Sequence, residues 1–132
     1  MKIDANLNNV KEIENLHTGT YGAVILTEPK AVISSQKKTP GIEFNFTLTD
    51  VGTEIAPGVP RVMTHTVYRS EKSGWEHFKM KELCEACGVP LENPDTADFV
   101  NVTLKLAVAE EPYKNKHGED KVRNQIDYFL KA

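Results

Sequence analysis

The stretch Ile42-Glu43-Phe44-Asn45-Phe46-Thr47-Leu48 decides the fold, because apolar and polar side chains alternate through it without a break. Successive side chains of a β-strand point to opposite faces, so a period of two predicts a strand with one buried and one solvated face. The solvated face carries Glu43, Asn45 and Thr47, which form hydrogen bonds but offer no ring for stacking. We therefore expect a half-buried strand with a polar face available for contacts.

The segment before this strand, Ser34 to Gly41, is polar and ends in the turn-forming residues Pro40 and Gly41. It carries the adjacent lysines Lys37 and Lys38. A solvated basic loop at the start of a strand with one polar face favours binding of a polyanion. We expect this loop to border such a surface.

The totals fit one folded domain. The chain has 132 residues, of which 39% are hydrophobic and 27% charged, values typical of a single globular unit. No apolar run is long enough for a membrane span, and the polar start does not resemble a secretory signal, so we expect an intracellular protein. The cysteines, Cys84 and Cys87, give no disulfide framework and suit a reducing compartment.

The net charge of −3 hides a segregation of charge along the chain. Residues 30–38 contain three lysines and no acid, and residues 61–81 contain five basic against two acidic residues. Residues 82–98 contain five acids and no base. A local field of one sign can bind a polyanion even when the whole chain is acidic, although charges on small domains also cluster by chance.

Residues 1–18 show no steady period, and we expect an arm or a short first element there, with the domain over residues 19–132. A β-prone run over residues 19–33 predicts a long first strand, bent where Gly22 and Pro29 interrupt the pattern. Residues 61–68 predict a third strand whose buried face the pattern leaves undecided. Further strands are expected over residues 99–109 and 122–130, joined by a polar loop over residues 110–120.

A helix is expected from Ser73, because Ser73 and Glu76 have the spacing in which side chain and backbone cap each other. Gly88 marks its end, and Asn93-Pro94-Asp95 predicts a cap for a brief helical turn. The apolar stripe, in which Trp75 is interpreted as a core residue, comprises Trp75, Phe78, Leu83, Ala86 and Cys87.

Three strands, a helix and two strands is the element order of the OB-fold, an all-β domain with one helix. We therefore predict a five-stranded OB-fold barrel with its helix between strands three and four. Four short motifs also resemble phage-encoded single-stranded DNA-binding proteins of this fold: Gly19-x-Tyr21, Lys38-Thr39-Pro40-Gly41, Leu83 through Cys87-Gly88-Val89, and Val122-x-Asn124-x-Ile126.

This resemblance implies a non-catalytic protein that binds single-stranded DNA largely independently of sequence, in phage DNA replication or recombination. Its implied partners are single-stranded DNA and replication or recombination proteins, with no membrane and no cofactor, and its implied state is a monomer or a homodimer. An OB-fold protein–protein interaction module, such as a replisome or virion accessory subunit, is the alternative.

Binding a single strand without reading its sequence needs cations that follow the phosphates and flat rings on which bases stack. Tyr68 and Tyr113 are the candidate rings, although Tyr68 also suits a core position and Tyr113 a half-buried loop position. The candidate phosphate-binding residues are Lys37, Lys38, Arg69, Lys114, Lys116 and Arg123.

Cys84 and Cys87 have the spacing of a zinc or redox motif, but a second pair is missing and a helix end disfavours a thiolate. We interpret them as small buried hydrophobic residues and expect no metal site. Nucleophile-elbow, phosphate-loop and zinc-protease motifs are absent from the sequence, so we expect no enzyme.

Overall fold

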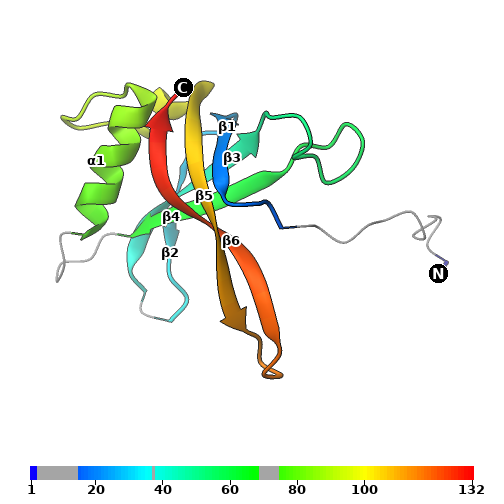
Figure 1. The fold of residues 1–132 in the computed structure, drawn as a ribbon. Coiled ribbons are helices and arrows are strands. Elements are labelled where there is room, and N and C mark those ends of the chain that lie inside the picture. The colour runs from blue at the N-terminus through cyan, green and yellow to red at the C-terminus, as the bar shows by residue number, and fades with distance from the viewer. Residues whose placement is uncertain (3–14, 37, 69–74) are drawn as a thin grey trace.

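The computed structural model describes residues 1–2, 15–36, 38–68 and 75–132. Most of these residues lie in one antiparallel sheet, with one α-helix beside it (Figure 1). The elements in chain order are β1 (Gly19–Ile25), β2 (Lys30–Ile33), β3 (Pro40–Leu48), β4 (Val62–Tyr68), α1 (Trp75–Cys87), the 3-10 helix η2 (Thr96–Phe99), β5 (Val102–Lys114) and β6 (Asp120–Lys131).

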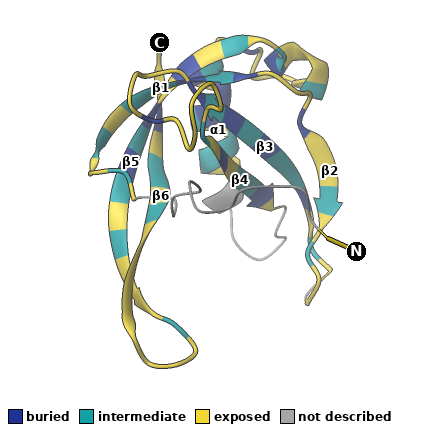
Figure 2. Cartoon of the chain, turned by 90° about the vertical axis from the view of Figure 1, so that its right-hand side faces the viewer, coloured by how far each residue is buried: buried dark blue, intermediate teal, exposed yellow. Residues whose placement is uncertain are grey.

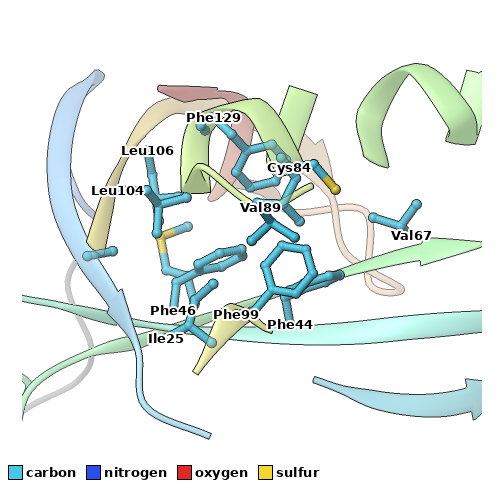
Figure 3. Close-up of a cluster of buried hydrophobic side chains, with 14 of the residues drawn as sticks. Ile25, Phe44, Phe46, Val67, Cys84, Val89, Phe99, Leu104, Leu106 and Phe129 are labelled. Carbon is cyan, nitrogen blue, oxygen red and sulfur yellow. The ribbon is translucent and has the colours of Figure 1, made fainter. Parts of the chain in front are cut away.

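Strand β3 lies near the middle of this sheet and, as its alternation predicts, has one buried face. The sheet order is β2-β3-β1-β5-β6, and β4 pairs with β3. Phe44 and Phe46 are fully buried and Leu48 is 2% exposed, whereas Glu43, Asn45 and Thr47 on the other face keep partial exposure. Figure 3 shows the two phenylalanines in the core beside Phe99 and Phe129, which contact them edge-on and tilted, respectively.

The sheet has six strands, so the prediction of five is wrong. The expected first strand over residues 19–33 is divided into β1 and β2, both of which pair with β3. Strand β1 ends at Ile25, whose carbonyl accepts a hydrogen bond from the backbone of Asn101. The division lies where Pro29, which is buried and lacks an N–H group, cannot continue a ladder of hydrogen bonds.

The sheet does not close into a complete barrel, because β4 and β6 form no ladder in the part of the chain described. Side chains nevertheless meet across the gap: the rings of His65 and Phe129 lie 5.4 Å apart, and Arg61, the residue before β4, donates to Asn124 at 3.2 Å. We call this junction the β4–β6 seam.

Helix α1 occupies part of the β6 edge that a neighbouring strand would otherwise use. Lys79 donates its ammonium N–H to the carbonyl of Asp127, and the Glu82 carboxylate accepts the backbone N–H of Phe129 at 3.2 Å. Lys79 and Glu82 also form an ion pair at 3.1 Å. These two side chains, which we call the clasp, satisfy backbone groups that pairing with β4 would satisfy in a closed barrel.

The inner face of α1 agrees with its predicted stripe at Leu83 and Ala86, which are buried. Phe78 is 71% exposed, so its predicted place in the stripe is wrong. Cys84, which the predicted stripe did not include, is buried beside Leu83 and Ala86. The buried face of the described part of α1 is therefore shorter than the predicted stripe, which included Phe78. The predicted cap at Ser73 lies outside the described residues.

The last two strands are longer than their sequence pattern indicates. Alternation predicts a fourth strand from Phe99, but Phe99 ends η2, which Asp95 caps together with Asp98, and β5 begins at Val102. The polar residues 110–120, predicted as a loop, mostly continue the β5–β6 ladder as far as Lys114 and Asp120. The backbone pairing therefore persists where burial, the signal visible in the sequence, has ended.

Candidate nucleic-acid interface

The outer face of β3 and β4 is polar. Asn45 lies opposite Thr64 in the ladder, and the Thr64 hydroxyl donates to the Asn45 side-chain oxygen at 2.7 Å. Glu43 lies opposite Thr66 and pairs with Lys30 at 3.5 Å. Because the Asn45 oxygen is occupied by Thr64, the amide NH₂ group is the part left to donate to a ligand.

The buried phase of β4 was undecided from sequence, and the structure resolves it. Met63 and Val67 face the core, with His65 between them half-buried, and Tyr68 lies on the outer face with 38% exposure. The Tyr68 ring lies over Gly41: a Cβ atom at that glycine would come within 2.8 Å of the ring. Tyr68 is therefore a partly exposed ring at the edge of the polar face and not a core tyrosine.

The loop between β2 and β3 carries Lys38 on an ordered turn. Ser34 organises this turn, because its backbone bonds to Thr39 and Lys38 while its hydroxyl accepts the Thr39 N–H at 2.9 Å. Lys38 adopts a left-handed conformation with φ 51° and is exposed. No ion pair of Lys38 occurs within the described residues, so its charge is available to a ligand.

The β5–β6 ladder ends in a hairpin, which we call the distal hairpin. It consists of the end of β5 from Glu110 to Lys114, the tip over residues 115–119, and the start of β6 from Asp120 to Asn124. At the tip, the Asn115 side chain accepts the backbone N–H groups of His117 and Glu119 at 2.9 and 3.0 Å. Lys114 and Lys116 beside it are exposed and form no ion pair with a described residue. The backbone that carries these lysines is therefore fixed by the turn, and both side chains reach solvent, although Asp120 lies opposite Lys114 in the ladder.

Tyr113 lies on a strand of the distal hairpin, in place of the predicted loop position. It is 38% exposed, and the Arg123 guanidinium lies 5.3 Å from the centre of its ring. Arg123 is also held by Glu111, with both nitrogen–oxygen distances 3.3 Å. One face of the ring is therefore covered, and Arg123 is engaged as a support for Tyr113 instead of standing free for a phosphate.

The β2–β3 loop and the distal hairpin point toward the same end of the molecule in both views (Figures 1 and 2). In Figure 2 the hairpin is almost entirely exposed, in contrast to the buried strand segments above it. The arrangement brings Lys38 to the same end as Tyr113, Lys114 and Lys116. The other two predicted site residues, Lys37 and Arg69, lie outside the described residues.

A groove of about 360 Å³ follows the β4–β6 seam between the polar face and the distal hairpin. Its lining residues include Thr64, His65, Arg123 and Gln125. Burial, followed by the nearby Lys79 charge, lowers the pKa of His65, so the ring is neutral near neutral pH. The groove thus extends the polar face toward the hairpin, where its charged lining consists of Arg123 and its ion-pair partner Glu111.

Cys84 is buried, as its interpretation requires, whereas Cys87 is only partly so. Cys84 is 2% exposed and Cys87 is half-buried, and both are free thiols. Burial, with a smaller contribution from Cys84, raises the pKa of Cys87 to about 12. Among the described residues, no group of three or more potential ligands could hold a metal ion.

The helices in the part of the chain that the structure describes are too short or too polar to cross a bilayer.

Sequence reasoning missed how Asn124 is used, although Asn124 belongs to one of the quoted motifs. Its side chain accepts the N–H of Leu16 and donates to the carbonyl of the same residue, both at 2.8 Å. It also accepts from Arg61. Asn124 of β6 thereby binds both the segment before β1 and the segment before β4. Leu16 and Asn124 are 108 residues apart, so this contact becomes visible only in the folded structure.

This arrangement consists of a polar two-stranded face, a basic loop and a hairpin with two free lysines and one supported tyrosine. It offers hydrogen bonds, positive charge and two partly exposed rings, Tyr68 and Tyr113. Comparison with protein-family models and with curated proteins found no match for this sequence.

Proposed function

We propose that this chain is a non-catalytic single-stranded DNA-binding protein that binds largely independently of sequence. The observation that carries the proposal is that the β2–β3 loop, which carries Lys38, and the distal hairpin, which carries Lys114 and Lys116, point toward the same end of the molecule. The polar face of β3 and β4 belongs to the same sheet. Positive charge for phosphates with few stacking rings suits binding of modest affinity and strong salt dependence.

The fold that we propose is an OB-type barrel left partly open at the β4–β6 seam. Three features support it: β1 and β2 act as the halves of one bent first strand, α1 follows the third strand of that scheme, and β5 pairs with β1. OB-folds bind oligonucleotides on the face of their second and third strands, between two loops that correspond here to the β2–β3 loop and the distal hairpin. The motif resemblance adds the setting, phage DNA replication or recombination in the host cytoplasm.

The test is a titration with fluorescent oligothymidylate at two salt concentrations. We expect saturable binding that weakens as salt rises. Replacing Lys114 and Lys116 by alanine should flatten the plot of log affinity against log salt by about 0.7 for each lost phosphate contact.

The matched control replaces Lys105 and Lys131, which are exposed and lie toward the other end of the β5–β6 ladder. This variant loses the same two charges and should keep the wild-type slope. Equal slopes for both double variants would show that the distal hairpin does not contact the strand. Absence of binding by the folded protein at low salt would contradict the proposal as a whole.

The protein–protein module remains the second candidate because of one observation. Phe78 of α1 is 71% exposed, and large exposed apolar side chains occur at protein interfaces. The titration separates the two functions, because a module with incidental lysines would not bind oligothymidylate.

A further inference from the structure

A pocket of about 470 Å³ lies at the end of the sheet where β2, β3 and β4 approach α1 and η2. Its base is apolar and includes Ile42, Phe44, Val67 and Phe99. His77 of α1 and Thr96 of η2 supply polar groups at its walls. The volume lies within the range of small-ligand sites, which are apolar with a few polar groups that orient the ligand.

The pocket is continuous with the candidate nucleic-acid interface. Tyr68 and Gly41, which form the end of the polar face, also line the pocket. Pro40, another lining residue, is two residues from Lys38 on the β2–β3 loop. A strand held by Lys38 would therefore have its next base close to the pocket entrance.

The charges around the pocket select which part of a nucleotide can enter. Asp95 lies between the lining residues Pro94 and Thr96, and its carboxylate caps η2 by accepting the N–H of Ala97 at 3.0 Å. An acid beside η2 repels a phosphate, while Lys38, two residues from the lining residue Pro40, attracts one. A neutral flat ring is compatible with both walls and with the apolar base.

We infer that this pocket takes one unstacked nucleobase of a bound single strand, with its phosphates on the Lys38 side. The apolar residues contact the faces of the ring, and the His77 and Thr96 side chains bond its polar edge. The inference rests on the proposed function and adds to it a binding site for one base. The polar face does not provide such a site, because Tyr68 is its single described ring.

The test fills the pocket and measures two ligands of equal charge. Ala31 lines the pocket from β2 and is exposed, so Ala31→Phe adds a ring there without disturbing the buried core. The ligands are oligothymidylate of about 12 nucleotides and an abasic strand of the same length. We expect Ala31→Phe to lose about tenfold in affinity for oligothymidylate and none for the abasic strand.

The control, Thr103→Phe, adds the same ring at an exposed position of β5 and should bind both ligands as the wild type does. Unfolding temperatures establish that both variants are folded. Wild-type affinity of Ala31→Phe for oligothymidylate would overturn the pocket inference and leave the proposed function standing. Failure of the wild type to bind either strand would overturn both.

A second measurement needs no variant. Titration of the wild type with thymidine monophosphate, followed by methyl resonances, should shift Ile42, Val67 and Met80 of the pocket. Val51, in the distant and fully exposed β3–β4 loop, should not shift. Shifts confined to residues outside the pocket would overturn the inference.

Discussion

Strand β3 and the distal hairpin share one backbone arrangement, antiparallel pairing, but differ in what their side chains meet. Phe44, Phe46 and Leu48 of β3 are buried, whereas none of the strand residues of the distal hairpin is buried. Hydrogen-bonded pairing is therefore not what separates the two regions. Burial of apolar area stabilises one region, and the other is free to carry charge and an aromatic ring to the surface.

Phe46→Ala should have the largest effect on stability. Phe46 is fully buried between Phe44 and Phe129, so its loss leaves a cavity in the centre of the sheet. We expect the free energy of unfolding, measured with urea, to fall by about 3–5 kcal/mol. A fall comparable to that of a surface variant would contradict the view that β3 carries the core.

Glu82→Ala should have the next largest effect, because it removes half of the clasp. Both the Phe129 N–H and the partly buried Lys79 ammonium lose a partner. We expect a loss of about 1–3 kcal/mol in the free energy of unfolding. Glu85→Ala is the control on the same helix: Glu85 is exposed and pairs with Lys81 at 3.9 Å, so its loss should change stability by less than about 0.5 kcal/mol.

A pH dependence should follow from His65 at the seam. Burial lowers its pKa in the folded state, so the unfolded chain binds a proton more readily. The contribution of His65 to stability is therefore fully present above its unfolded pKa of about 6.5. It is lost as the pH falls from there through the folded pKa, and the loss is about 1.4 kcal/mol for each pH unit that separates the two pKa values.

Unfolding of His65→Gln, compared with the wild type at about pH 7.5 and about pH 5, should show a smaller loss on acidification. His117→Gln is the control, because His117 is exposed at the tip of the hairpin. Identical pH dependence in all three proteins would assign the acid sensitivity to groups other than the seam histidine.

Tyr113→Ala should change stability least and binding most clearly. Its ring contacts Arg123 on the distal hairpin and does not belong to the core cluster, so we expect the free energy of unfolding to change by less than about 0.5 kcal/mol. Loss of a stacking ring should weaken oligothymidylate binding by about 1–3 kcal/mol. A large loss of stability would show that the hairpin belongs to the folded core after all.

The sequence predicted those parts of the fold in which burial and periodicity agree. Alternation located β3 and most of β5, and turn chemistry placed a cap within Asn93-Pro94-Asp95, where Asp95 caps η2. The polar strands of the distal hairpin could not be found in this way, because their pairing continues the β5–β6 ladder and leaves no hydrophobic pattern. Pro29 indicated an interruption of the first strand. The sequence pattern does not distinguish a bend within one strand from a break between two strands.

The sequence predicted which residues belong to the candidate site better than it predicted the contacts that they make. Lys38, Lys114 and Lys116 were predicted as phosphate-binding cations in polar segments, and the structure shows them exposed. The engagement of Arg123 with Glu111, and the position of Tyr68 over Gly41, depend on cross-strand register. Register is a property of the assembled sheet, so neither contact could be derived from spacing along the chain.

The clasp also bears on how the protein behaves when it is crowded. A strand edge with open N–H and C=O groups is a template on which other chains can add, and natural sheets usually block such edges. Lys79 and Glu82 occupy the groups of Asp127 and Phe129, so part of β6 is closed to intermolecular pairing by the protein's own helix. At Asp127 and Phe129, the helix thus blocks the strand addition that an open β6 edge would permit.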